Sequence, residues 1–237
     1  MKQRVARLAL GTLIALVFAA LVALGTWQLE RRSWKLALIA QVEQRLHAPP
    51  VAAPGPGAWG AIDDGDVYTR VVASGRYRAG ADSFVQASTQ LGPGYWVLTP
   101  LDTGKFTLLV NRGFVPPELR GKVAAPEGQV SVEGLLRVTE PGGGFLRSND
   151  PAQDRWYSRD VAAIANKRGL ENVAPYFIDA VEPRSGWPRG GLTVVRFRNN
   201  HLGYAFTWFG LAAGLLVMVA VARRWGREVH EAPPHDA

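Results

Sequence analysis

One of the four histidines in this chain occupies a position from which an imidazole could coordinate a metal. His201 opens a long apolar run, whereas the other three histidines lie in polar stretches. If the run is helical, Tyr204 and Trp208 follow at i+3 and i+7, on the face that carries His201. Proteins bind the iron of a porphyrin through an imidazole in such surroundings. These residues therefore suggest a haem site with His201 as the metal ligand.

Aromatic residues also gather at the end of an earlier apolar run. If the two runs form antiparallel helices, Trp27-Gln28 lies at the depth of the start of the second run. Trp27, Trp34, Tyr204 and Trp208 would then form a collar of rings, with Arg31 near the propionates of a porphyrin. The plainer interpretation is that Trp and Tyr collect at membrane interfaces because their rings are amphipathic, and that the histidine is simply hydrated. Composition leaves both interpretations open.

Familiar catalytic motifs are absent from the sequence. It contains no HExxH, GxSxG, P-loop or dinucleotide-binding GxGxxG pattern. Asp63-Asp64-Gly65-Asp66 lacks the ligand spacing of a calcium loop and is expected to be a solvated turn. The absence of cysteine excludes disulfides and thiolate-bound metal centres. We therefore expect no enzyme, and a membrane-anchored hydrolase or oxidoreductase is the least favoured class.

Two apolar runs bracket the chain. Residues 8–26 and 204–222 contain no charged side chain. A helix over residues 5–25 would reach roughly 30 Å, the thickness of the hydrocarbon layer. A cleavable signal peptide ending near Ala23-Leu24-Gly25 is the alternative for the first run, although the apolar core of such peptides is usually shorter. We expect two transmembrane helices in the lipid bilayer, over residues 8–26 and 201–222.

The charge distribution suits a membrane better than a nucleic acid. Lys and Arg outnumber Asp and Glu by 27 to 20, and they cluster beside the apolar runs rather than in one stripe. Such clusters match anionic lipid head groups, so no nucleic-acid partner is expected. Basic residues before residue 8 and after residue 222 favour cytoplasmic termini. Those on the other side of the runs (Arg31, Arg32, Lys35, Arg196 and Arg198) bring the comparison close to a tie.

Between the runs, the apolar periodicity changes from helical to extended. Apolar residues recur at helical spacing from Leu29 to Leu46, which predicts an amphipathic stalk that ends at Ala48-Pro49-Pro50 and a linker to about residue 60. Short β-branched and aromatic segments follow at 67–77, 83–87, 95–100, 106–111, 129–138, 176–181 and 192–198. One helix is expected at 160–168, with Ser158 as its cap and Gly169 as its end.

These patterns predict an α+β membrane protein. Two transmembrane helices flank an antiparallel β-rich domain, either barrel-like or a curved sheet, with one or two helices. The expected segments are an N-terminal stretch (1–7), a first span (8–26), stalk and linker (27–60), the β-rich domain (61–200), a second span (201–222) and a tail (223–237). The β-rich domain and the two termini are expected on opposite sides of the membrane.

Four blocks of sequence, in order along the chain, resemble the Surfeit locus protein 1 family. They are Leu24-Gly25-Thr26-Trp27-Gln28-Leu29-Glu30-Arg31, Gly94-Tyr95-Trp96-Val97-Leu98-Thr99-Pro100-Leu101, Val110-Asn111-Arg112-Gly113-Phe114-Val115-Pro116 and Asn200-His201-Leu202-Gly203-Tyr204-Ala205-Phe206-Thr207-Trp208-Phe209-Gly210-Leu211. Trp34-Lys35 and Gly75-Arg76-Tyr77 add to the likeness, and the layout of two spans around one domain is the same.

This resemblance implies an assembly factor for cytochrome c oxidase in which the domain lies outside the cytoplasm and both termini lie inside. It implies transient binding of haem a through His201, with Trp208 close to the cofactor. The implied partners are oxidase subunit I and, as a further candidate, the haem a synthase. Because no Ser-rich transit segment precedes the first run, a bacterial inner membrane is the expected location.

An alternative is a scaffold that docks on subunit I or on the haem a synthase without binding haem. In that case, changes in residues 94–101 or 111–116 would impair oxidase assembly, whereas loss of His201 would not.

The roles of two residues of the β-rich domain are open from the sequence. Arg112 could bind a partner or a propionate, or pair with Asp102 or Glu118. Gly75 could be required by backbone geometry or by close packing.

Overall fold

The computed structural model describes residues 2–144, 146–181, 186–192 and 199–231. The chain divides into two compact units. One comprises Met1–Gln41 together with Arg196–Ala237, and the other comprises Val42–Val195.

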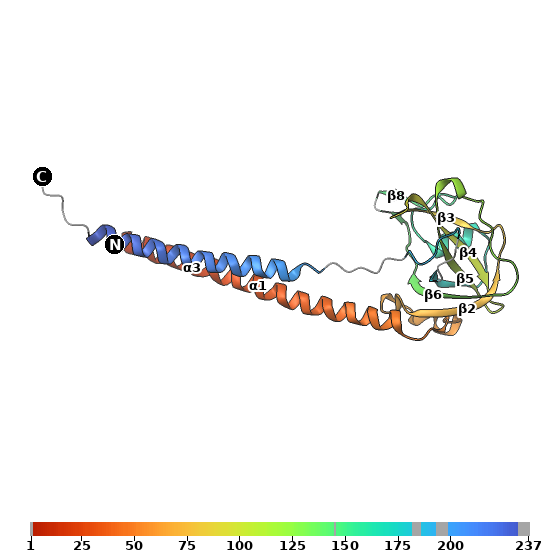
Figure 1. Cartoon of the computed structure of the whole chain (residues 1–237), viewed down its shortest axis with the longest axis horizontal. Helices are drawn as coiled ribbons and strands as arrows, with labels where there is room; N and C mark the ends of the chain where they lie inside the picture. Colours follow the sequence, from red (N-terminus) through yellow and green to blue (C-terminus); the bar gives the residue numbers. More distant parts are fainter. Residues whose placement is uncertain (1, 145, 182–185, 193–198, 232–237) are drawn as a thin grey trace. The chain divides into compact units, whose positions relative to one another are not determined.

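Two long helices, α1 (Lys2–His47) and α3 (His201–Glu231), make up the first unit apart from the last turns of α1 (Figure 1). Both are long and apolar enough to cross a membrane. Large apolar side chains such as Leu8 and Phe206 are exposed on them, an arrangement suited to contact with acyl chains. The helix continues without a break from the apolar run into the predicted stalk. It ends just before Ala48-Pro49-Pro50, because proline disfavours helical geometry in the residue before it.

A stripe of less exposed residues on each helix marks where α1 and α3 pack together. On α3 its members recur four and three positions apart: His201, Ala205, Trp208, Ala212 and Leu215. On α1 the corresponding positions are Phe18, Leu21, Val22, Gly25 and Gln28. Gln28 contacts His201, whereas Gly25, one turn earlier, contacts Phe209, two turns later. The helices are therefore antiparallel, and the spacing is that of side chains packed knobs-into-holes.

The second unit is built on a seven-stranded sheet with the order β1-β2-β6-β9-β5-β4-β3. Its strands are β1 (Val51–Ala52), β2 (Arg70–Tyr77), β3 (Ser83–Thr89), β4 (Gly92–Asp102), β5 (Thr107–Val115), β6 (Val130–Val138) and β9 (Val173–Ala180). A separate two-stranded ribbon joins β7 (Gly143–Gly144) and β8 (Arg147–Ser148). Short 3-10 helices occupy Pro56–Ala61, Asp64–Asp66 and Pro117–Leu119.

The sheet closes on itself because β2 pairs with β4 as well as with β6. The ring of strands runs through β2, β6, β9, β5 and β4, and Figure 1 shows its strong coiling. The barrel-like domain predicted from the sequence is thus confirmed. The expectation of an antiparallel sheet is wrong for two pairs, since β9 lies parallel to β5 and β1 lies parallel to β2. Alternation of apolar residues reports which face of a strand is buried and carries no information on strand direction.

Gly75 makes the closure of the ring possible. A Cβ atom at this position would collide with the backbone carbonyl oxygen of Asp102 on β4. The neighbouring pair Arg76 and Asp102 is where β2 and β4 meet. Close packing, rather than an unusual backbone conformation, is therefore the reason for glycine at position 75.

Two hydrophobic clusters stabilise the domain, one on each face of the sheet. The first fills the ring of strands and includes Val71, Leu101, Leu108, Val110, Tyr176 and Ile178. The second lies beneath α2 (Val161–Lys167) and includes Val85, Leu109, Trp156, Ile164 and Phe177. Burial on both faces explains why every residue of β5 is buried and why Leu108, Leu109 and Val110 follow one another without a polar residue between them.

The small helix α2 differs from the prediction at its start. The carboxylate of Asp160 accepts a hydrogen bond from the N–H of Ala163 at 3.0 Å, so Asp160 is the cap and the assignment to Ser158 is wrong. The Ser158 hydroxyl instead donates to the carbonyl oxygen of Glu140 at 2.6 Å. Gly169, with φ of +60°, ends the helix as predicted. The strand predicted at 192–198 falls almost entirely on residues outside the described part of the chain.

Candidate cofactor site between the two apolar helices

His201, at the first turn of α3, is held by a hydrogen bond to α1. Its Nδ1 lies 2.8 Å from Oε1 of Gln28, which is only 9% exposed. An amide oxygen only accepts hydrogen bonds, so Nδ1 carries the proton in this arrangement. The lone pair of the neutral ring is then on Nε2. Histidine ligands of metals are commonly oriented by this type of bond from the other ring nitrogen.

The packing of the two helices sets the position of this pair. Gly25, one turn before Gln28, lies against the ring of Phe209, and a Cβ atom there would be 2.6 Å from that ring. The absence of a side chain lets the helices approach closely at this level. Ala205, on the next turn of α3 after His201, is almost fully buried. The small residues therefore bring Gln28 within hydrogen-bonding distance of the imidazole.

Trp208 lies two turns along α3 from His201, on the same partly buried stripe. Its indole Nε1 is buried and has no hydrogen-bond partner among the residues that the structure describes. Buried N–H groups nearly always have a partner in proteins, so such a group requires an explanation. An acceptor supplied by a bound molecule would satisfy it.

Tyr204 and Trp27 lie outside the helix contact. Tyr204 is 57% exposed and Trp27 is 51% exposed, whereas His201 and Trp208 are half-buried. Tyr204 therefore occupies the flank of α3 rather than the stripe shared by His201 and Trp208. No ring contact joins Trp27, Trp34, Tyr204 and Trp208 in the described part of the chain, so the predicted collar is not formed by rings packed on one another.

Arg31 lies one helical turn beyond Gln28 on α1. Its guanidinium stacks over the ring of Trp34, with Cζ 4.3 Å from the ring centroid. The two residues are three positions apart, which places them on one face of the helix. The backbone of Arg31 lies about 4.5 Å along the helix axis from that of Gln28.

The acidic cluster near the start of the β domain does not resemble a metal site. Asp63 caps the 3-10 turn Asp64–Asp66 through reciprocal hydrogen bonds, which confirms the predicted turn. Within residues 2–144, 146–181, 186–192 and 199–231, no group of three or more His, Asp or Glu side chains is placed to hold a metal ion.

Arg112 has a structural role in the β domain. The residue is 2% exposed, and its guanidinium donates to the carbonyl oxygens of Ala124 at 2.8 Å and Val123 at 3.2 Å. Its ion-pair partner is Asp82, at 4.0 Å, which was not one of the two carboxylates considered for it. The side chain thus ties the 120s loop to β5 from inside the domain.

A buried polar network joins β5, β6 and β9 around Asp179, which is 3% exposed. Its carboxylate accepts hydrogen bonds from Asn111 Nδ2 at 2.7 Å and Arg137 Nη1 at 3.2 Å. Arg159 contributes a further contact at 3.4 Å and also pairs with Glu140. The buried charge of Asp179 is therefore matched by two arginines.

Two carboxyl groups of the domain have lowered pKa values. Burial by itself would raise the pKa of Glu140, but the hydrogen bonds and charge of Arg159, with the charge of Arg137, hold it below its ordinary value. The pKa of Asp154 is lowered in the same way, against burial, by Arg168 and by the indole N–H of Trp156. Both carboxylates are stabilised in the charged form.

Comparison with known proteins assigns the family. A model of the SURF1 family matches residues 15–213, a span that contains all four sequence blocks. This chain belongs to the SURF1 family. Surfeit locus protein 1 of Homo sapiens is 38% identical over 215 residues, covering 80% of this chain and 69% of the human protein. A SURF1-like protein of Monosiga brevicollis is 35% identical over 235 residues, covering 89% and 87%. Surfeit locus protein 1 of Takifugu rubripes is 33% identical over 232 residues, covering 86% and 93%.

The blocks of this SURF1-family chain have two structural roles. The first and last supply the helix contact, with Gln28 from one and His201 from the other. The middle two form adjacent strands β4 and β5, in which Asn111 and Arg112 anchor the buried polar contacts. Sequence reasoning placed Gln28 at the depth of His201 but assigned it no role. The feature that could have indicated its role is that Gln28 is an amide side chain directly after an apolar run.

Proposed function

We propose that this protein is a membrane-anchored, non-enzymatic assembly factor for cytochrome c oxidase. It binds haem a transiently and assists insertion of the haem into subunit I, or its retention there. The observation that supports this most directly is the hydrogen bond between His201 Nδ1 and Gln28 Oε1 within a pair of apolar helices. It leaves Nε2 as the ring nitrogen able to bind iron.

The residues around His201 suit a porphyrin. The helix surfaces are strongly apolar, as a macrocycle requires. The exposed rings of Trp27 and Tyr204 offer faces for it, and Trp208 offers an unpaired N–H within the described residues. Arg31 is the cation proposed for a propionate. If haem is bound, His201 would be the residue that holds its iron.

The proposed location is a bacterial inner membrane, with α1 and α3 as the two spans, the termini in the cytoplasm and the β domain in the periplasm. Two helices of sufficient length and the membership of the SURF1 family support this arrangement. The haem site then lies where α3 enters the lipid. Haem a is the cargo, and its proposed recipient is oxidase subunit I, with the haem a synthase as the candidate donor.

An absorption spectrum tests the ligand assignment. Protein purified in detergent from cells that make haem a is compared with the His201→Ala variant and with His47→Ala. His47 is an exposed histidine at the end of α1 and serves as the matched control. We expect His201→Ala to lose the bound-haem bands and His47→Ala to keep them. Normal haem content in purified His201→Ala would refute the assignment.

A second candidate is a scaffold that docks on subunit I or on the haem a synthase without binding haem. It is favoured by the separate β domain, which contains two of the four family blocks in adjacent strands. Under this hypothesis, oxidase activity in cells survives His201→Ala and falls when residues 94–101 of β4 or residues 111–116 are changed. Loss of oxidase activity together with loss of haem in His201→Ala would exclude it.

A further inference from the structure

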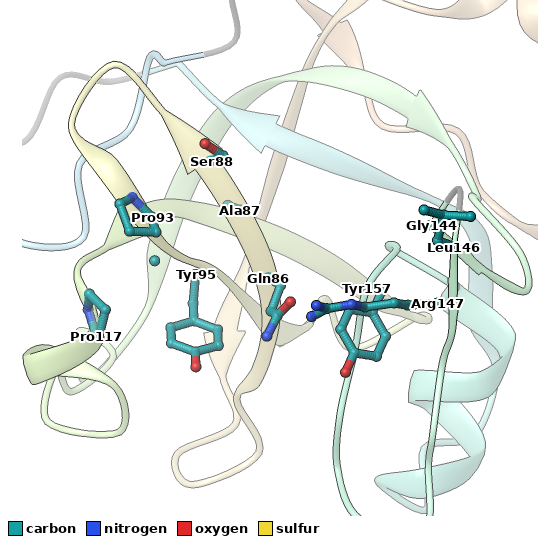
Figure 2. Close-up of a pocket in the computed structure, with 11 residues that line it drawn as sticks. Gln86, Ala87, Ser88, Pro93, Tyr95, Pro117, Gly144, Leu146, Arg147 and Tyr157 are labelled. Carbon is teal, nitrogen blue, oxygen red and sulfur yellow. The ribbon is translucent and has the colours of Figure 1, made fainter.

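A cavity of about 550 Å³ opens on the β domain beside β3 and β4. Figure 2 shows its two walls: Gln86, Ser88, Pro93 and Tyr95 come from the paired strands, and Arg147 and Tyr157 face them. A second cavity of about 280 Å³ continues from it, because Gln86, Tyr95 and Tyr157 line both. The two cavities together form an elongated site, called here the arginine cavity.

Three arginines, Arg120, Arg147 and Arg155, line this site. Aromatic rings hold two of them in place: Arg120 lies 4.8 Å from the Tyr95 centroid, and Arg147 lies 5.5 Å from the Tyr157 centroid. Neither cavity has an Asp or Glu among the described residues that line it. The site is therefore strongly positive, and aromatic stacking leaves the N–H groups at the edges of these two guanidinium groups available to an anion.

The arginines of this cavity differ from the other arginines of the β domain in their ion pairing. Within the described part of the chain, none of the three arginines forms an ion pair within 4.0 Å, although ion pairs are otherwise common in this domain. The paired arginines are Arg70, Arg112, Arg137, Arg159 and Arg168. Carboxylates thus match the cations that stabilise the fold, whereas no carboxylate of the described residues forms an ion pair with the arginines of this cavity.

The same site contains an open strand edge. The N–H of Gln86 donates to the carbonyl oxygen of Trp156 at 2.9 Å, so it points away from β4. Backbone N–H groups alternate along a strand, and that of Ser88 therefore points the same way. In the described chain, Val85 is the only residue of β3 with a bridge to Trp156, and no strand continues the pairing towards Ser88. The free edge at Ser88 and Arg147 line the first cavity, and Arg120 and Arg155 line the second cavity that continues from it.

We propose that the arginine cavity binds an extended, acidic segment of a partner protein. The segment adds to the free edge of β3 at Ser88, beyond the N–H of Gln86, which is already bonded to Trp156. Its carboxylates pair with Arg120, Arg147 and Arg155, and its apolar side chains contact Pro93 and Tyr95. Main-chain bonds at a sheet edge provide affinity in this mode of recognition, and side-chain pockets provide specificity. A segment of six residues extends about 20 Å.

Calorimetric titration of the full-length protein in detergent tests the proposal. The probe is an acetylated and amidated peptide of six residues that alternates glutamate and valine. A peptide alternating lysine and valine controls for sequence-independent edge pairing, and glutarate controls for binding of a free dicarboxylate. We expect the acidic peptide alone to bind. No binding of the acidic peptide, equal binding of the lysine peptide, or equally tight binding of glutarate would each overturn the proposal.

Substitution of the arginines tests the contribution of charge to peptide binding. Arg120→Gln, Arg147→Gln and Arg155→Gln together should weaken the acidic peptide at least about ten-fold, since each exposed ion pair contributes modestly. Arg76→Gln with Arg78→Gln removes exposed charge outside the arginine cavity and should change affinity less than about two-fold. Unchanged affinity in the triple variant would refute the role of the charge. If that variant does not fold, Arg147→Gln alone, at an exposed site, answers the same question.

Ser88→Pro tests the strand edge, because proline removes the outward N–H and is tolerated at edge positions. It should weaken the peptide about five-fold or more while the thermal unfolding midpoint stays unchanged, since a net backbone hydrogen bond contributes on the order of 1 kcal/mol. Full affinity in the folded Ser88→Pro protein would refute edge pairing. Peptide affinity is measured without haem. A failure to bind the peptide therefore does not refute the proposed haem binding, and a failure to bind haem does not refute peptide binding.

Discussion

Gly25 on α1 lies directly against the ring of Phe209 on α3, with no room for a side chain between them. Replacing Gly25 with valine would push the helices apart and lengthen the Gln28–His201 contact. We expect the Gly25→Val protein to lose most of its bound haem although the proposed ligand is intact, and to be destabilised by about 1–3 kcal/mol as in other overpacked sites.

Haem absorbance per protein and thermal unfolding in detergent measure this effect. Gly11→Val is the matched control, because a Cβ atom at Gly11 of the same helix meets nothing within 4 Å. Equal haem retention in Gly25→Val and Gly11→Val would show that the helix contact does not support the site.

Gln28 is expected to act as a positioning residue for His201. In Gln28→Leu the imidazole loses its acceptor, and haem affinity should fall about 10- to 100-fold, the usual effect of removing such a partner. Gln28→Glu keeps an acceptor and should retain most of the affinity.

Titration of haem into the haem-free protein gives these affinities, and Gln41→Leu is the control at an exposed glutamine on α1. A Gln28→Leu protein with wild-type affinity would mean that the hydrogen bond does not orient the ligand.

Closure of the barrel should depend on Gly75. Gly75→Ala places a methyl group against the carbonyl oxygen of Asp102, and the steric conflict is with backbone, which cannot move aside cheaply. We expect a loss of about 1–3 kcal/mol in the free energy of unfolding. Chemical denaturation followed by tryptophan fluorescence measures it. Gly60→Ala, at a site with open space, should remain close to wild type; equal stability of the two variants would contradict the packing argument.

Acid should destabilise the β domain through Glu140 and Asp154. Their folded-state pKa values lie below the ordinary values, so the folded domain binds fewer protons than the unfolded chain in this range. The stabilisation is complete above about pH 4.5 and is lost as the pH falls through the folded-state pKa values.

Thermal unfolding midpoints measured from pH 7 to pH 3 test the predicted loss of stability in acid. Glu140→Gln should lower the midpoint at pH 7 and flatten its fall in acid, whereas Glu171→Gln, at an exposed site, should leave both unchanged. A midpoint that rises on acidification would be inconsistent with charged, ion-paired carboxylates.

Several features of this molecule could be read from local pattern. The two apolar runs, the helical continuation to the prolines and most strand positions follow from side-chain periodicity and from the restrictions that proline and glycine place on the backbone. The cap of α2 was misplaced by two residues, because Ser158 and Asp160 are both good caps and only their surroundings decide between them. Parallel pairing of β5 with β9 was missed because it joins strands far apart in the chain.

The sequence by itself determined that an imidazole stands at the start of an apolar helix, with an indole two turns away, because helical spacing is a local property. Only the tertiary structure decided that Gln28 bonds to that imidazole, that Tyr204 lies on the flank, and that Arg112 and Asp179 are buried inside the β domain. It also brought three unpaired arginines of the described chain to the free edge of β3. These relationships join residues distant in sequence, and packing of whole elements, rather than local preference, sets the distances between them.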